Sequence, residues 1–413
     1  MRTRNRWLPL LMLLTAGAVR AADSDAMIQK IRTGTLVVRA KPGAKIQVEQ
    51  LRHEFWFGAT LPTGLFTGRM SPEDATRFKE VFLRNFNAGV IEAAFKWHDM
   101  ERERGIVNYA TVDAMLRWAD AAGIPLRGHC LYWGIPNRVQ PWLKELTDAD
   151  LRRELVERGR AMGARYRGRF AEFDLNNEMI HANYYAERLG AGITKEMAGW
   201  VREGDPDAVL FVNDYDITTG NRLDDYVKHI RELLNQGVPL GGIGVQGHLH
   251  GDSFDPAALQ NSLDVLAQFN LPIRITEFNF PGQRSKYYRD PEARKQMLSA
   301  EEEQAKAVAL TQFFRICFAH PAVTGIMMWG FWEGANWIPQ SSLYKRDWTA
   351  TPAARAYEDL VLGQWWTRWS GTAGPNGQAR IPAFFGKHRV TIDGRERLVE
   401  LHRGDQERLV EAP

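Results

Sequence analysis

The sequence predicts a (β/α)8 barrel accompanied by a small β-sandwich. Within residues 55–363, eight short runs of apolar and β-branched residues alternate with amphipathic segments. Strands that alternate with helices form a parallel sheet, and eight such units close into a barrel. The chain has 413 residues, 44% of them hydrophobic and 25% charged, which suits a barrel with a further part added. The segments 22–54 and 364–413 carry strand and turn patterns, so we assign them to the sandwich.

The barrel elements follow from local patterns. The predicted strands are Phe55–Leu61, Asn87–Ala93, Pro125–Trp133, Ala171–Glu178, Val209–Ile217, Gly241–Leu249, Pro272–Phe280 and Gly325–Glu333. The predicted helices are Ser71–Asn85, Thr111–Gly123, Thr147–Arg167, Asn221–Gly237, Asp255–Asn270 and Pro291–His320. Two of these helices open with Ser-Pro-Glu-Asp and Thr-Asp-Ala-Asp, which are typical of helix N-termini.

The two flanking segments read as β-structure. Thr35–Gln50 is typical of two short strands around the turn Lys41-Pro42-Gly43. Ser370–Leu401 is typical of strands broken by a Gly-Pro-Asn-Gly turn and by Asp393-Gly394. Together they predict one accessory domain built from both ends of the chain.

Residues 1–21 read as a signal peptide. A start rich in arginine precedes the apolar run Leu8–Leu14, and Val19-Arg20-Ala21 suits cleavage after Ala21. The apolar run is too short to span a bilayer comfortably. We therefore expect a secreted or periplasmic protein that is free of the membrane after cleavage. Removing the four arginines of this segment, which holds no acid, takes the formal net charge from +3 to −1.

Polar residues end seven of the eight predicted strands. Because the chemistry of such barrels takes place at the C-terminal ends of the strands, these residues are the candidates for a functional site. They are Glu92, His129 with Trp133, Asn177 with Glu178, Asn213 with Asp214, Gln246 with His248 and His250, Glu277 with Asn279, and Trp329.

Two of these residues form a pair of carboxyl groups suited to cleaving a glycosidic bond. Glu178 ends the fourth strand and Glu277 ends the seventh, across the barrel from each other. Glycoside cleavage needs one protonated carboxyl that donates to the leaving oxygen and one ionised carboxylate, about 5–5.5 Å away in retaining enzymes. Asn177 is placed to donate to a sugar hydroxyl, and His248 to keep Glu277 anionic. We therefore expect Glu178 to be the general acid/base and Glu277 the nucleophile.

The residues also resemble a known family. Seven separate blocks between Phe55 and Gly363 resemble glycoside hydrolase family 10, the endo-β-1,4-xylanases. The blocks are Glu92-x-x-x-Lys96-Trp97, Arg127-Gly128-His129-x-Leu131-x-Trp133, Asp174-x-x-Asn177-Glu178, Asn213-Asp214-Tyr215, Gly242-Ile243-Gly244-x-Gln246-x-His248-Leu249, Ile275-Thr276-Glu277, and Trp329-Gly330 followed by Trp337.

The resemblance implies a role for each matching residue. Glu178 matches the family's acid/base and Glu277 its nucleophile, in hydrolysis of xylan-type polysaccharide by double displacement. His129, Asn177, Gln246 and His248 match residues around the reactive sugar. Tyr215 matches a residue near the cleavage point, and the glycone subsites are matched by Glu92, Lys96, Trp133, Trp329 and Trp337. No cofactor or metal is implied.

The sequence departs from the family pattern at four places. Ala93 replaces an Asn that bonds the glycone sugar, and Gly134 replaces a His. Asn279 replaces an Asp that orients the His of the sixth strand, and an amide there makes protonated His248 less favoured. Phe331-Trp332-Glu333 is bulkier than the usual start of this loop. The exact glycan therefore stays open.

Three alternatives accompany this interpretation. A family 10-like hydrolase of another β-linked or substituted glycan would explain the departures, as would a glycan-binding protein without catalysis. His129, His248, His250 and Glu178 could instead hold a metal ion. Nothing in the charge pattern indicates a nucleic-acid partner. The expected partner is a polysaccharide or oligosaccharide, bound by a monomer.

Overall fold

The computed structural model describes residues 24–249 and 254–412. The chain divides into two compact units, which are described separately. The larger unit comprises residues 56–310 and 322–356. The smaller unit takes in residues up to 55, 311–321 and 357 onward. The predicted signal peptide and His250 lie outside the described residues.

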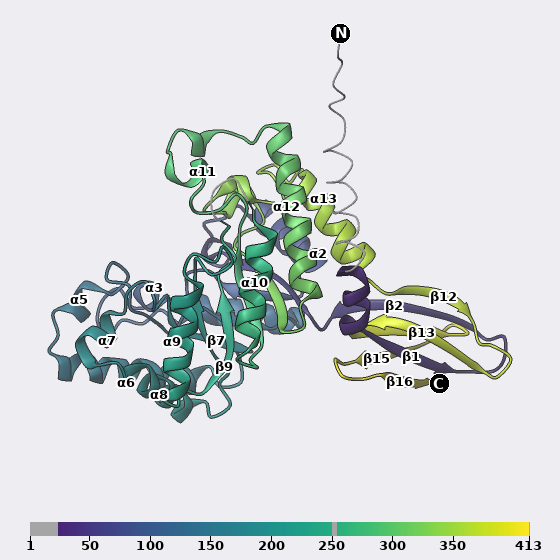
Figure 1. The fold of residues 1–413 in the computed structure, drawn as a ribbon, viewed down its shortest axis with the longest axis horizontal. Helices are drawn as coiled ribbons and strands as arrows, with labels where there is room; N and C mark the ends of the chain where they lie inside the picture. The colour runs from purple at the N-terminus through teal and green to yellow at the C-terminus, as the bar shows by residue number, and fades with distance from the viewer. Residues whose placement is uncertain (1–23, 250–253, 413) are drawn as a thin grey trace, which may run out of the picture. The chain divides into compact units, whose positions relative to one another are not determined.

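The larger unit is a closed parallel barrel, as the sequence predicts (Figure 1). Its strand order is β5-β4-β3-β11-β10-β9-β8-β7-β6, and an additional pairing of β5 with β7 closes the ring. The third barrel strand is interrupted, because β5 and β6 are two short pieces that both pair with β7. The strands are β3 Trp56–Leu61, β4 Ala88–Ile91, β5 Leu126–Gly128, β6 Tyr132–Trp133, β7 Glu172–Asn177, β8 Leu210–Asp214, β9 Leu240–Val245, β10 Ile273–Phe278 and β11 Val323–Met328.

Helices connect these strands. They are α2 Pro72–Asn85, α3 Trp97–Met100, α4 Ala110–Ala122, α5 Pro141–Lys144, α6 Asp148–Arg165, α7 Tyr184–Leu189, α8 Ile193–Gly204, α9 Leu223–Asn235, α10 Pro256–Ala267, α11 Lys286–Arg289, α12 Ala300–Ala319 and α13 Pro352–Tyr357. The 3-10 turns are Thr63–Leu65, Ala293–Lys295, Glu333–Ala335 and Pro339–Ser341, and Glu358–Gln364 is a π-helix. In the described residues, no helix is both long and apolar enough for a membrane span.

Side-chain caps fix where several helices begin. Ser71 accepts a hydrogen bond from the backbone of Asp74 (3.1 Å) at the start of α2, as the Ser-Pro-Glu-Asp pattern predicts. The predicted helix Pro291–His320 is too long, because α12 begins only at Ala300. A capping box sets that start: Ser299 Oγ accepts from Glu302 N (3.2 Å), and Glu302 Oε2 accepts from Ser299 N (2.8 Å).

Helix α8 was not among the sequence-based predictions. It packs on α6 at a distance that only glycine allows, since a Cβ on Gly163 would lie 2.2 Å from the carbonyl oxygen of Val201. A Cβ on Gly204 would lie 2.3 Å from the backbone nitrogen of Ala164. The close packing of α6 and α8 therefore depends on these two glycines, one within α6 and one at the end of α8.

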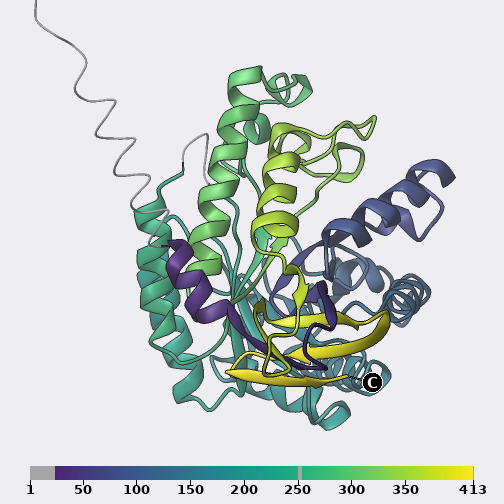
Figure 2. The same cartoon turned by 90° about the vertical axis from the view of Figure 1, so that its right-hand side faces the viewer.

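The smaller unit is a β-sandwich whose strands come from both ends of the described chain (Figure 2). One sheet has the order β13-β1-β16 and the other β12-β2-β14-β15. Apolar residues of both sheets, including Leu36, Ile46, Ile381 and Val390, form one core. The strands are β1 Thr33–Arg39, β2 Lys45–His53, β12 Arg368–Thr372, β13 Gln378–Phe384, β14 Gly386–Ile392, β15 Arg395–Leu401 and β16 Glu407–Glu411.

Two details of the sandwich differ from a simple reading of the sequence. Residues 24–32 are helical, so the N-terminal segment is not all β-structure. The strands on either side of Lys41-Pro42-Gly43 belong to different sheets rather than to one hairpin. In contrast, Asp393 and Gly394 join β14 to β15, and both have positive φ (47° and 84°), as a tight two-residue hairpin turn requires.

Candidate active site

The barrel strands bring most of the sequence-predicted residues to one rim. Glu178 directly follows β7 and adopts a left-handed backbone conformation (φ 61°), which is uncommon for a residue other than glycine. Its carboxylate accepts hydrogen bonds from Gln246 Nε2 and Trp133 Nε1, both at 2.9 Å. These donors come from the ends of β9 and β6, so three barrel strands fix the position of Glu178.

The second carboxylate, Glu277, lies near the end of β10 and is only 4% exposed. Its Oε2 lies 3.0 Å from His248 Nε2, and its Oε1 accepts from Asn213 Nδ2 at 3.1 Å. Both oxygens therefore have a partner, which holds the carboxylate in one orientation.

The two carboxyl groups experience opposite electrostatic surroundings. Burial raises the pKa of Glu178, and the nearby charges of Glu277 and Asp214 oppose its ionisation further. Burial would also raise the pKa of Glu277, but the hydrogen bond from His248 and the proximity of His129 and Lys96 outweigh it, so this pKa is lowered. Surroundings that shift the pKa values of two carboxyl groups in opposite directions are what assign acid and nucleophile.

Asn213, at the end of β8, is a site residue whose role the sequence reasoning missed. Its amide nitrogen donates to Glu277 Oε1 and to Asn177 Oδ1 (3.0 Å), and its oxygen accepts from Thr276 Oγ1 (2.7 Å). Asn213 therefore links Glu277 to Asn177, the residue that precedes Glu178. Its place at a strand end within the Asn-Asp-Tyr block was the signal available. Asn177 Nδ2 is buried and has no hydrogen-bond partner among the described residues.

The amide of Asn279 orients His248. Its Nδ2 donates to the Trp329 carbonyl (3.0 Å) and to Ser341 Oγ (2.8 Å), and its Oδ1 accepts from Trp337 Nε1 (2.9 Å). This orientation turns Oδ1 toward His248 Nδ1, 2.9 Å away. Both ring nitrogens of His248 thus lie within hydrogen-bond distance of an oxygen, Asn279 Oδ1 on one side and Glu277 Oε2 on the other. Asn279 therefore places a hydrogen-bond acceptor beside His248 at the position where the family has an Asp. Unlike an Asp carboxylate, this acceptor carries no charge.

Aromatic and charged side chains surround the carboxyl pair. Lys96 Nζ lies 4.9 Å from the ring centroid of Trp133 and 5.6 Å from that of Trp329. Trp337 packs against His248, with ring centroids 5.0 Å apart. Burial raises the pKa of Glu92, and the positive charge of Lys96 opposes that shift.

Tyr215, after β8, stacks on His181 with ring centroids 3.5 Å apart and an angle of 11° between the planes. His181 Nδ1 lies 2.7 Å from Asp214 Oδ1, and this buried carboxylate also accepts from the backbone of Ile180. Burial and the nearby Glu178, Asp216 and Asp214 raise the pKa of Tyr215 to about 12. The phenol therefore stays neutral at physiological pH.

A buried ion-pair network lies along the strands that carry the site. Arg127 pairs with both Asp174 and Glu172, and Arg274 donates to Glu172 at 2.9 and 3.1 Å. Asp174 Oδ2 in turn lies 2.8 Å from His129 Nδ1. Two arginines thus balance two carboxylates, and the network fixes the orientation of His129.

Removing Arg127 is expected to destabilise the barrel strongly. Arg127→Met leaves Asp174 buried without its cation, and breaking one side of such a pair typically costs roughly 3–5 kcal/mol of unfolding free energy. Arg169→Met, which breaks an exposed pair with Asp120, should cost about 1 kcal/mol or less. Urea unfolding followed by tryptophan fluorescence would measure both, and equal losses would contradict the importance of the buried network.

Two of the departures from the family pattern have a structural explanation. A Cβ on Gly134 would lie 3.2–3.3 Å from atoms of Tyr185, Asn183 and Tyr184, so a larger side chain needs this segment to move. Trp332 is 5% exposed and stacks on Trp348, with ring centroids 4.5 Å apart. The bulky start of this loop therefore packs into the protein.

The metal-binding alternative concerns the histidines at the rim. The ring nitrogen Nδ1 of His129 lies within hydrogen-bond distance of Asp174, and the two ring nitrogens of His248 lie within hydrogen-bond distance of Asn279 and Glu277. Within residues 24–249 and 254–412, no group of three or more His, Cys, Asp or Glu side chains could hold a metal ion. His250 is not among those residues.

A parallel (β/α)8 barrel with two carboxyl groups of opposed electrostatics at its rim, bordered by tryptophans, defines the architecture of a glycoside hydrolase. The model of glycosyl hydrolase family 10 matches residues 52–360, and the chain belongs to this family.

Among curated relatives, anti-sigma-I factor RsgI6 of Acetivibrio thermocellus is 34% identical over 378 residues, covering 90% of this chain and 46% of its own length. Endo-1,4-beta-xylanase 1 of Arabidopsis thaliana is 32% identical over 354 residues, covering 85% of this chain and 34% of its own. The chain thus spans less than half the length of these relatives. The crystal structure of xylanase 10B from Thermotoga maritima matches with a TM-score of 0.66 and 25% identity, covering 75% of this chain and 95% of that one.

Proposed function

We propose that the protein is a retaining hydrolase of β-1,4-linked xylan-type polysaccharide. The observation that carries this proposal is the pair of carboxyl groups at one barrel rim, of which Glu178 has a raised pKa and Glu277 a lowered one. Membership of glycosyl hydrolase family 10 and the similarity to plant and bacterial xylanases support the choice of substrate.

In the first step, Glu277 attacks the anomeric carbon while Glu178 gives its proton to the glycosidic oxygen. The bond to the leaving sugar breaks and a covalent glycosyl-enzyme ester forms. In the second step, Glu178 removes a proton from water, which attacks the same carbon and releases Glu277 as a carboxylate. Two displacements restore the original anomeric configuration, and the proton returns to Glu178.

The neighbouring side chains support these roles. His248 and Asn213 donate to Glu277, which favours its ionised form as nucleophile and as leaving group. Asn177 Nδ2 supplies a free buried donor for a sugar 2-hydroxyl, an interaction that strengthens in the transition state. His129 and Gln246 complete the group around the reactive sugar.

The proposed glycone subsites combine aromatic faces with charged partners. Trp133, Trp329 and Trp337 present flat apolar rings to the CH faces of a sugar, while Glu92 and Lys96 serve its hydroxyl edges. Tyr215 borders the cleavage point. Ala93 and Asn279 change the hydrogen-bonding partners in the site, and such a change shifts which sugar hydroxyls the site accepts. The activity on several glycans therefore has to be compared.

The test is a product analysis on defined xylo-oligosaccharides, with the anomeric configuration of the first product followed by NMR. We expect hydrolysis with retention. Inversion would exclude the double displacement, and binding without release of reducing sugar would favour a non-catalytic glycan-binding protein. Parallel assays on xylan, glucuronoxylan, mixed-linkage glucan and cellulose show whether the preferred substrate is xylan or another β-linked glycan.

Asn279→Ala is expected to slow turnover without removing either carboxyl group. The change removes the acceptor that holds His248 in place, weakening a hydrogen bond to the charged Glu277. Hydrogen bonds to charged groups contribute roughly 1.5–3 kcal/mol, which corresponds to about 10- to 100-fold in kcat. Asn279→Asp keeps an acceptor and should retain most of the rate. Wild-type turnover by the alanine variant would argue against this role.

We further propose that the protein is exported and acts as a monomer. The basic start, the apolar run and the small residues before position 22 support a cleaved signal peptide. N-terminal sequencing of the protein from culture medium or periplasm should begin at Ala22. An intact N-terminus on a cytosolic protein would contradict export, and light scattering would report the oligomeric state.

A further inference from the structure

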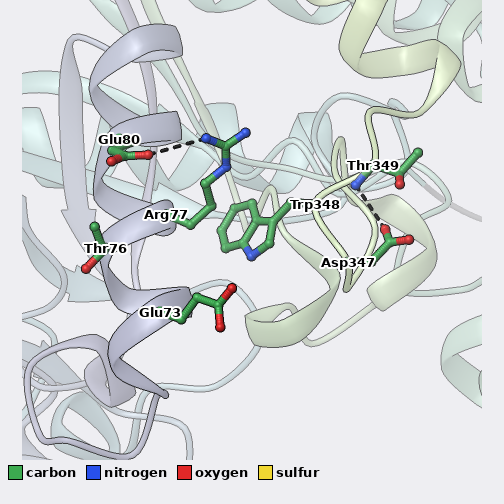
Figure 3. A pocket seen from close by; sticks show the side chains of 7 residues that line it. All are labelled: Glu73, Thr76, Arg77, Glu80, Asp347, Trp348 and Thr349. Carbon is green, nitrogen blue, oxygen red and sulfur yellow. Dashed lines mark hydrogen bonds and ion pairs between the residues drawn. The ribbon is translucent and has the colours of Figure 1, made fainter.

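A pocket lies between helix α2 and the turn at residues 345–349, and its lining includes none of the candidate catalytic or sugar-binding residues (Figure 3). Its volume is about 620 Å³. Helix α2 contributes four polar side chains to its lining, and the turn contributes Asp347, Trp348 and Thr349. The size falls within the range of small-ligand sites, about 300–1,000 Å³.

Trp348 is held rigidly at this pocket. Its backbone has φ 68°, a conformation that costs a bulky residue energy and often marks a functional position. Its indole stacks on Trp332 with 5° between the ring planes, and its Nε1 donates to Asp74 Oδ1 at 3.0 Å. Trp332 is itself anchored, because its Nε1 donates to the Arg346 carbonyl (3.2 Å). The bulky loop start found in the sequence therefore supports a partly exposed tryptophan.

The rest of the lining supplies hydrogen-bonding groups and an excess of negative charge. Glu73, Glu80 and Asp347 contribute three carboxylates, while Arg77 contributes one guanidinium, 3.3 Å from Glu80. Carboxylates accept hydrogen bonds from hydroxyl groups and repel anions. This balance suits an uncharged, hydroxyl-rich ligand.

We propose that this pocket, formed by α2 and Trp348, is a second carbohydrate-binding site that takes an uncharged stretch of β-1,4-xylan. The choice of sugar rests on the proposed function. A tryptophan beside acceptors and one guanidinium offers a partner both for the CH face of a pyranose and for its hydroxyls. Binding at this second position increases the local concentration of polymer at the enzyme without new contacts to the reacting sugar.

Trp348→Ala and the double variant Arg77→Ala/Glu80→Ala test the proposal. The double variant removes an exposed ion pair on α2 and leaves Trp348 packed. Its matched control is Lys228→Ala/Glu232→Ala, which removes an exposed ion pair on α9. Each change is placed in a Glu277→Ala background to stop turnover, and retardation is measured in native gels containing neutral xylan. We expect both pocket variants to weaken binding at least about threefold and the control to match the parent.

The same changes in the active enzyme provide the second measurement. Hydrolysis of a short aryl xylobioside should be unchanged, whereas hydrolysis of insoluble xylan should fall at least about threefold. Unchanged retardation in both pocket variants would overturn the proposal, as would equal loss on the short substrate, which would place the effect in the cleft. If the unmodified enzyme hydrolyses no xylo-oligosaccharide, the proposed function fails, while retardation by xylan still decides whether the pocket binds sugar. Glucuronoxylan should bind more weakly than neutral xylan.

Discussion

Replacing Glu277 with alanine is expected to lower kcat on xylo-oligosaccharides by at least about 10³-fold, because it removes the group that forms the covalent intermediate in the proposed double displacement. The alanine variant also leaves room for a small anion. Azide should then attack the anomeric carbon directly and yield a glycosyl azide of inverted configuration. Measuring kcat with and without azide, and identifying that product by NMR, tests the assignment of the nucleophile.

The control must separate chemistry from folding, since Glu277 is buried and has two hydrogen-bonded neighbours. Glu277→Gln keeps the volume and should be similarly inactive. Glu303→Gln changes another buried glutamate, which pairs with Lys306, and should retain the rate. A glutamine variant at position 277 with near wild-type turnover would exclude Glu277 as nucleophile.

Replacing Glu178 with alanine is expected to give a loss that depends on the leaving group. Substrates whose leaving sugar needs a proton should lose about 10²–10⁴-fold, the usual contribution of general acid catalysis. An aryl glycoside with an activated leaving group should be largely spared in the first step. Steady-state kinetics on an oligosaccharide and on a dinitrophenyl glycoside make the comparison, and equal losses would contradict the acid role.

The pH profile provides an independent readout of the same residue. In the wild type, the rate falls at low pH as Glu277 becomes protonated, and the lowered pKa of this group moves that limb to lower pH. The rate falls at high pH as Glu178 loses its proton, and its raised pKa moves that limb upward. Glu178→Ala should therefore remove the alkaline limb and keep the acidic one.

The sequence predicted the barrel and its rim because both depend on local patterns. Apolar runs of strand length mark each barrel strand, and a polar residue at the end of a run marks the rim. The fourth and seventh strands end near Asn177 and Phe278, as expected. Two predicted helices also begin where the observed ones do, because Ser71 and Thr147 cap the N-termini of α2 and α6.

The remaining features depend on contacts between distant residues, which periodicity does not report. The linking role of Asn213 requires knowing that Asn177 and Glu277, 36 and 64 positions away, lie within reach of one amide. The orientation of Asn279 depends in the same way on Trp337. The loop start at Trp332 looked like a change in the cleft, but its stacking partner, Trp348, is visible only in the folded chain.

The pairing of β1 with β16 has a consequence for how the chain is made. Thr35 lies beside Glu407 in a parallel pair, so the first strand of the sandwich meets this neighbour only when residues 407–411 have emerged from the ribosome. Until then, β1 presents open backbone donors and acceptors, which are prone to pair with other chains. Polypeptides that terminate early, before residue 407, should therefore aggregate or be degraded.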